Sequence, residues 1–339
     1  MWDPRRYLDT DFGLDDDDSF EPLDTGEPDE IDHSQPHIVT VMGAIDPDDL
    51  GVCQPCEHVT GWPGGDAPAQ GVLPADYLEQ VANELEAFIT VGGRSMVDVS
   101  TGDSGRDVNA LRLLAQRVPV HLVCATGRHV LDRAGDGPLD PAEFESALMR
   151  EIRDGIGMSG VRPGLIVLGT TRYGLVPASI GTAVARVAVE SGLPILVCGM
   201  SASQSHELLD WAEHTGLAPN RVILGHLDRS LEVQDLARLA RRGARLVVDR
   251  IGTDPLVPDR QLASQVLQMA EAGFAGSLLL SQGLAGSEQF VMNGSGPGWI
   301  HLLERFTLEL MAAGAGADLV RVLLVENPAR ALTIDPTSA

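Results

Sequence analysis

Residues 95–126 read SMVDVSTGDSGRDVNALRLLAQRVPVHLVCAT and contain one complete strand–helix–strand stretch. The apolar runs at 95–100 and 120–126 are continuous, as is typical of parallel strands that are covered on both faces. Between them, 108–116 has apolar residues at helical spacing. This stretch therefore predicts one β/α unit and the strand of the next.

The same alternation continues along the chain. The other predicted strands are 51–58, 164–168, 194–198, 221–226, 244–249 and 277–281, and the other predicted helices are 75–90, 141–154, 179–190, 205–215, 231–241, 260–271 and 298–312. About eight such units predict a single-domain α/β protein, a (β/α)8 TIM barrel over residues 36–335. A doubly wound sheet is the alternative fold, but no G-x-G-x-x-G motif follows the first strand.

The charge is strongly negative and unevenly spread. The net charge is −25, and residues 1–35 hold thirteen acidic residues against two arginines. This opening lacks apolar periodicity and predicts a disordered acidic arm, which either aids solubility or docks a basic partner. The remainder is also acidic, so nucleic acid and anionic membranes are excluded as expected partners.

Targeting features and cysteine content favour a reducing compartment. The chain has no apolar run of about 18 residues and no signal peptide, so we expect no membrane span and a cytoplasmic location. Four cysteines in 339 residues do not form a disulfide framework. The oligomeric state is left open, with a homodimer as one alternative.

Polar side chains recur where the predicted strands end, which is where barrel enzymes place their chemistry. These positions include Cys56, His58, Ser100, Thr126, Cys198, His226, Asp249 and Ser281. Because carboxyl ends of barrel strands meet at one face, we expect these side chains to line one pocket.

Several segments carry a family resemblance. VDVSTGDSGRDVNAL followed by VHLVCATG resembles the second and third strand units of the phosphotriesterase family, in the amidohydrolase superfamily. The segments TVMGAIDPDDLGV, SGLPI, NRVILGHLD, VDRIG and ENPARAL are similar to other parts of that family. The resemblance implies a zinc-type metallohydrolase of phosphotriesters, lactones or related esters.

The resemblance also implies a two-metal site, which this sequence does not preserve. The family uses a His-x-His pair, a carboxylated lysine, two further histidines and an aspartate, and these fall here on Cys56, His58, Val167, Cys198, His226 and Gly283. Only the two histidines match. Since the chain contains no lysine, no carboxylated lysine can bridge two metals. The sequence therefore predicts at most one metal ion.

Two chemistries remain open at these positions. Two thiolates and two imidazoles suit one tetrahedral zinc ion, held by Cys56, His58, Cys198 and His226. Alternatively the protein is metal-free, with Cys56 as a nucleophile and His226 as its base. A redox pair of Cys56 and Cys198 is disfavoured, because such motifs usually sit at a helix N-terminus.

Other polar residues complete the predicted pocket. Asp228 and Asp249 would orient His226 or act as a base, although Asp249 with Arg250 also fits a structural ion pair. Substrate contacts are predicted from residues near the strand ends, namely Arg128, His129, Arg172, Tyr173 and Arg250. Arginines on pocket loops favour a small anionic substrate, whereas ordinary loop solvation is the alternative.

Three classes of function follow. The first is a small-molecule hydrolase of esters, lactones or phosphoesters with a rewired site. The second is a metal-free enzyme on the same barrel, such as a lyase, a cyclase or a thiol-dependent enzyme. The third is a non-catalytic pseudoenzyme that binds a small molecule or a protein. Descent favours the hydrolase, although a fold alone does not establish an activity.

Overall fold

The computed structural model describes residues 34–61, 73–133, 138–227, 232–294 and 296–336. The acidic arm predicted at 1–35 lies almost entirely outside these residues, and so does Asp228. No helix in the described part of the chain is long and apolar enough to cross a membrane.

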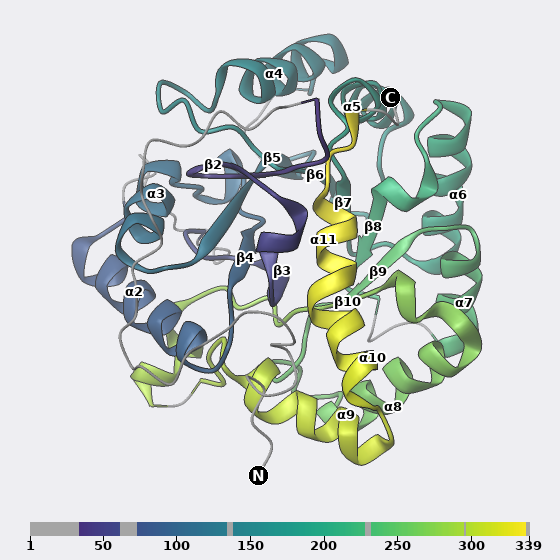
Figure 1. Cartoon of the computed structure of the whole chain (residues 1–339). Helices are drawn as coiled ribbons and strands as arrows, with labels where there is room; N and C mark the ends of the chain where they lie inside the picture. Colours follow the sequence, from purple (N-terminus) through teal and green to yellow (C-terminus); the bar gives the residue numbers. More distant parts are fainter. Residues whose placement is uncertain (1–33, 62–72, 134–137, 228–231, 295, 337–339) are drawn as a thin grey trace.

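Eight parallel strands form a nearly closed barrel, in which each strand pairs with the next one along the chain (Figure 1). The strands are β3 (Cys53–Glu57), β4 (Ser95–Asp98), β5 (His121–Val130), β6 (Leu165–Thr170), β7 (Ile195–Cys198), β8 (Val222–Gly225), β9 (Arg245–Val248) and β10 (Leu278–Leu280). The (β/α)8 barrel predicted from the sequence is confirmed.

Continuous apolar strands are needed because both faces of this sheet are buried. On β6, Leu165 and Val167 pack in the barrel interior, whereas Ile166 and Leu168 pack in the outer layer against the helices. Successive side chains of a strand point to opposite faces, so each strand supplies both layers. Each strand therefore fixes which of its residues reach the interior.

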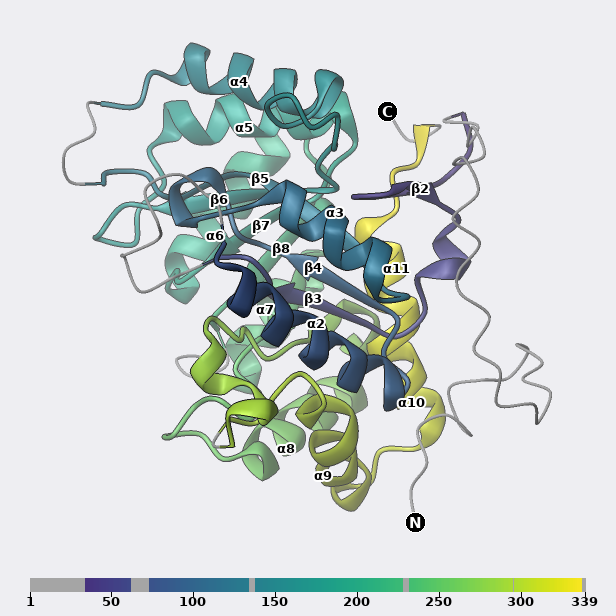
Figure 2. The ribbon, with the colours of Figure 1, turned by 90° about the vertical axis from the view of Figure 1, so that its left-hand side faces the viewer.

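Helices surround the barrel, as the two perpendicular views show (Figures 1 and 2). They are α2 (Ala75–Thr90), α3 (Val108–Arg117), α4 (Pro141–Asp154), α5 (Ala178–Ser191), α6 (Ala202–His214), α7 (Val233–Arg241), α8 (Asp259–Met269) and α9 (Thr307–Ala313). Side-chain caps set several starts: Asp107 accepts bonds from the first backbone N–H groups of α3, and Asp140 does the same for α4.

A hairpin and the C-terminal helices cover the amino-terminal end of the barrel. The hairpin joins β1 (Ile38–Thr40) to β2 (Gly43–Ile45), and the helices are α10 (Ala317–Arg321) and α11 (Asn327–Leu332). Ile38 from the hairpin and Leu332 from α11 belong to the interior apolar cluster. This end of the barrel is thus plugged by the two ends of the folded chain.

The first and last strands, β3 and β10, are joined through side chains. The Ser281 hydroxyl accepts a hydrogen bond from the Cys56 N–H (3.0 Å) and donates one to Glu57 Oε1 (2.6 Å). The Glu57 carboxylate also accepts from the N–H groups of Gln282 (2.7 Å) and Leu284 (2.8 Å). Strand alternation directs the Glu57 side chain to the opposite face of β3 from Cys56. Glu57 therefore joins β3 to the residues that follow β10, and we call this junction the seam.

Candidate functional site

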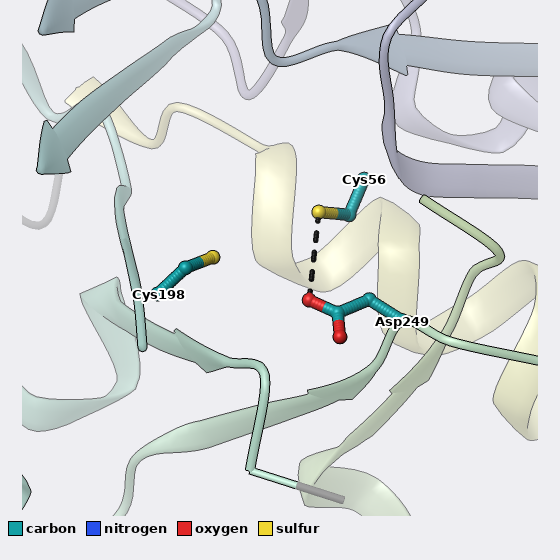
Figure 3. A group of neighbouring side chains, drawn as sticks. All are labelled: Cys56, Cys198 and Asp249. Atoms are coloured by element: carbon teal, nitrogen blue, oxygen red, sulfur yellow. Dashed lines mark hydrogen bonds between the residues drawn. The ribbon is translucent and has the colours of Figure 1, made fainter. Parts of the chain in front are cut away.

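Three side chains of types that can bind metal ions converge at the carboxyl end of the barrel. Cys56 comes from β3, Cys198 ends β7, and Asp249 directly follows β9. Their ligand atoms all lie within 4.8 Å of one another, and Cys56 Sγ is 3.8 Å from Asp249 Oδ2. Figure 3 shows the three side chains pointing toward a common space. We refer to Cys56, Cys198 and Asp249 as the Cys–Asp cluster.

A glycine makes room for this convergence. Gly225 ends β8, between Cys198 on one neighbouring strand and Asp249 beyond the other. A Cβ atom on Gly225 would lie 2.6 Å from Cys198 Sγ and 2.7 Å from Asp249 Oδ2. A Cβ atom does not lie this close to a non-bonded heavy atom, so any residue larger than glycine would push the cluster apart.

His226 is fastened to the cluster through Asp249. Its backbone N–H donates to the carboxylate, at 3.2 Å from Oδ1 and 3.1 Å from Oδ2, and its ring Nδ1 lies 2.8 Å from Oδ2. The backbone of His226 adopts a left-handed φ of 58°. That conformation costs a non-glycine residue about 1–3 kcal/mol and is concentrated at functional sites.

The charges of the cluster alter the proton affinities of its members. Burial alone would lower the pKa of His226, but the negative charges of Cys198 and Asp249 outweigh burial and raise this pKa to about 9. A hydrogen bond with Cys198, burial and the Asp249 charge raise the pKa of the Cys56 thiol. Without a metal, Cys56 therefore stays protonated while His226 carries a positive charge at neutral pH.

A pair of neutral histidines lies at the same end of the barrel. The ring centroids of His58 and His129 are 5.3 Å apart. His58 Nδ1 is 3.2 Å from Ser100 Oγ, and His129 Nε2 is 2.8 Å from the Val99 carbonyl oxygen. Burial lowers the pKa of His58 to about 3, assisted by repulsion from His129 and His226. Burial also lowers the pKa of His129. Both rings are thus uncharged at neutral pH.

The predicted substrate-binding arginines all have acidic neighbours. Arg128 Nε lies 3.9 Å from Asp103 Oδ2, and Arg250 Nη1 lies 3.8 Å from Asp254 Oδ2. Arg172 Nε lies 2.9 Å from Asp132 Oδ2. The guanidinium of Arg172 also covers the ring of Tyr173, which is 73% exposed. These contacts weaken the sequence argument for an anionic substrate at the carboxyl end of the barrel.

The two positions that correspond to the family's lysine and aspartate are occupied by residues without metal-binding side chains. Val167 is buried in the apolar interior of the barrel. Gly283 has a left-handed φ of 61°, and a Cβ atom there would lie 2.6 Å from the Asp249 carbonyl oxygen. Neither position provides a metal-binding side chain, and Gly283 leaves no space for one.

The cluster differs in composition from the predicted zinc ligands. Cys56 and Cys198 were expected in it, whereas Asp249 was expected as a base, as an orienting group or in a structural ion pair with Arg250. Among the described residues, His58 and His226 are not part of the group whose ligand atoms lie within 4.8 Å. The local sequence predicts neither the space beside Gly225 nor the backbone conformation of His226, because both depend on residues of neighbouring strands.

The sequence model of the phosphotriesterase family matches residues 36–332. A phosphotriesterase homology protein from Mycobacterium tuberculosis is 27% identical over 319 residues, covering 87% of this chain and 97% of the relative. An N-acetyltaurine hydrolase from Danio rerio is 24% identical over 341 residues, covering 87% and 97%.

A solved structure shows the same fold. The crystal structure of a lactonase from Listeria monocytogenes matches with a TM-score of 0.79 at 21% identity, covering 88% of this chain and 99% of that chain. The family match spans nearly all the described residues, including both ends of the barrel. The chain belongs to the phosphotriesterase family.

Proposed function

We propose that this chain is a hydrolase of a small ester, lactone or phosphoester and that its Cys–Asp cluster holds at most one metal ion. The observation that carries the proposal is the convergence of two sulfur atoms and a carboxylate within 4.8 Å at the carboxyl end of the barrel. Hydrolytic activity is supported by family membership and by the likeness to an N-acetyltaurine hydrolase. The lactonase is similar in fold.

A two-metal site does not fit these residues. The chain has no lysine to carry a bridging carbamate, and the equivalent position is Val167. At the position of the family's aspartate, Gly283 has no side chain and no room for one. Two adjacent cations need a bridging anion and more negative ligands than the cluster offers, so we infer no reaction step that requires two metals.

A single zinc ion does fit the donor set. Zinc accepts thiolate and carboxylate ligands, and a catalytic zinc typically has three protein ligands and one open position. In this proposal Asp249 takes the place of His58 and His226 among the ligands, because His58 contacts Ser100 and His226 contacts Asp249. When bound, such an ion would polarise the substrate oxygen and lower the pKa of a coordinated water.

The protein's own residues hold the proton-transfer group in place. Asp249 binds both the backbone N–H and the ring Nδ1 of His226, which fixes the position of the ring. The remaining ring atom, Nε2, is then the one that can exchange a proton with the substrate or its leaving group. Asp249 would therefore act as a ligand and as an orienting group at once.

A metal-free thiol hydrolase is the second candidate function. Asp249 and His226 form a carboxylate–imidazole pair at 2.8 Å, and Cys198 is the only partly exposed sulfur of the cluster, since Cys56 is buried. Cys198 would attack the ester carbonyl, the leaving alcohol would take a proton from His226, and water would hydrolyse the resulting thioester to the acid and the free thiol. This reading replaces the buried Cys56 by Cys198 as nucleophile.

Metal analysis of the purified full-length chain separates the two candidates. We expect close to one zinc per chain, a marked fall in Cys198→Ala and Asp249→Asn, and no change in Cys53→Ala, whose thiol lies at the start of β3. Ester and lactone hydrolysis should then be lost on chelation and restored by zinc. Two zinc ions per chain would contradict the single-metal proposal.

A metal-free protein would also be informative. If it hydrolyses esters and a substrate-derived thioester on Cys198 is found by mass spectrometry, the second candidate is supported. If it contains no metal and hydrolyses none of a panel of esters, lactones and phosphoesters, the proposed hydrolase function is wrong.

A further inference from the structure

A cavity of about 630 Å³ lies at the amino-terminal end of the barrel. Its walls come from the β1–β2 hairpin, from 159–163 before β6, from the end of α5 up to Leu193, and from 334–336. Pro163 and Leu193 precede the strands β6 and β7, so the cavity lies at the opposite end from the Cys–Asp cluster. Its volume falls within the roughly 300–1,000 Å³ that is usual for small-molecule sites.

The walls combine apolar side chains with cationic groups. Val39, Val41, Ile152, Leu193 and Ile334 provide apolar surface. The two arginines in the lining are Arg112 and Arg162. Such a lining suits a molecule with an apolar body and a polar end.

The arginine charges are compensated to different degrees. Arg112 donates to the Ser159 carbonyl at 3.1 Å, a bond to an uncharged group. The Arg162 guanidinium is exposed and has neither an ion pair nor a hydrogen bond with any residue that the structure describes. Arg162 is therefore available to an anion.

The acidic groups of the lining do not cancel this charge. Glu190 forms an ion pair with Arg153, outside the cavity lining. Asp335 also has a partner within the protein. An incoming anion would thus meet a cation that no described acidic side chain neutralises.

We propose that this cavity is a second binding site, for a small molecule with an apolar body and one anionic group. A medium-chain carboxylate is the simplest such molecule, because its chain would pack on the Val39 and Val41 side and its carboxylate would pair with Arg162. A guanidinium binds a carboxylate with two parallel hydrogen bonds, which favours it over an uncharged head group. The site is independent of the hydrolytic function proposed for the other end of the barrel.

The test uses sodium decanoate below its micelle concentration and the full-length protein. Calorimetric titration should show saturable binding of one decanoate per chain, and decan-1-ol should bind at least about tenfold more weakly. Arg162→Gln should weaken decanoate binding by a similar factor. The matched control Arg260→Gln, at an exposed arginine of α8 outside the cavity, should bind as the wild type does.

Two further variants locate the site. Ala44→Trp should abolish decanoate binding by filling the cavity, with an unchanged circular dichroism spectrum as the check on folding. Cys198→Ala should bind decanoate normally, because it alters only the opposite end of the barrel. No saturable binding, wild-type affinity in Arg162→Gln, or loss of binding in Cys198→Ala would each overturn the proposal.

Discussion

At the scale of single residues, Gly225 controls whether the Cys–Asp cluster can form. We expect Gly225→Ala to retain less than half of the wild-type zinc, since the new methyl group would displace Cys198 or Asp249. Overpacking of this kind typically lowers the free energy of unfolding by about 1–3 kcal/mol. Metal analysis and urea denaturation provide the two measurements.

A second glycine serves as the control for this substitution. A Cβ atom on Gly276 would have no neighbour within 4 Å, so Gly276→Ala should keep both its metal and its stability. Full zinc content in Gly225→Ala would show that the cluster does not depend on the space above this glycine.

The sequence predicts the place of a single residue only where its position relative to a strand decides that place. That Cys56 and Cys198 lie close together could be predicted, because each lies near the end of an apolar strand and the barrel fold brings strand ends together. The part played by Asp249 could not be settled, because an aspartate at a strand end fits a base, an ion pair or a ligand equally well. The left-handed backbone of His226 occurs together with hydrogen bonds from its N–H group to Asp249, 23 residues further along the chain.

At the scale of elements, the seam between β3 and β10 depends on Glu57. Its Oε1 accepts from Ser281, Gln282 and Gly283, and its Oε2 accepts from Leu284 and Trp299. Burial raises the pKa of Glu57 to about 7, although these hydrogen bonds oppose the shift. A single side chain therefore joins the first strand to the segment that follows the last one.

We expect Glu57→Gln to lower the free energy of unfolding by about 2–4 kcal/mol. A glutamine can offer only one oxygen, so in either orientation its amide group faces at least two N–H or O–H donors, and each unsatisfied buried donor costs about 1–3 kcal/mol. Urea denaturation gives the measurement, and Glu309→Gln, at an exposed position of α9, is the control. A change below 0.5 kcal/mol, about what a surface substitution produces, would show that the seam does not need the carboxylate.

Strands and helices were predictable where their apolar pattern extends over enough residues. The eight barrel strands and most helices lie within a few residues of the predicted ranges, because their apolar patterns are strong. The β1 and β2 strands have three residues each and are too short to carry a pattern. Strand β5 extends to Val130 rather than residue 126, since its ladder with β6 continues through backbone groups regardless of the polar side chains Arg128 and His129.

At the scale of the whole molecule, buried neutral histidines make stability depend on pH. Burial lowers the pKa of His129, and likewise that of His121, below the value of about 6.5 in an unfolded chain. As the pH falls below about 6.5, these histidines take up protons in the unfolded chain but not in the folded chain. The free energy of unfolding therefore falls with pH until the pH reaches the pKa of the histidines in the folded chain.

We therefore expect the wild type to lose up to about 1 kcal/mol more than His129→Gln between pH 6.5 and 5.5. Comparing the two chains at each pH by urea denaturation removes the contributions of all other groups, including Glu57. His214→Gln, at the exposed end of α6, is the matched control and should follow the wild type. Parallel curves for the wild type and His129→Gln would contradict the prediction.

The global architecture was predictable, but the closure of the barrel and the cavity at its amino-terminal end were not. The number of β/α units sets the barrel, whereas the seam depends on contacts between residues more than 220 positions apart, such as Glu57 and Ser281. The cavity depends on how the hairpin and the C-terminal segment meet. The seam and the cavity both form where segments far apart in the sequence meet, and no local sequence pattern predicts such contacts.

The long sequence separation within the cluster also bears on how the protein matures on the ribosome. Cys56 and Asp249 are 193 positions apart, so a nascent chain contains Cys56, and later Cys198, before the carboxylate of Asp249 is synthesised. The seam at Ser281 follows later still. An ion held by all three residues can therefore be fully coordinated only after strands β3 to β9 have been translated.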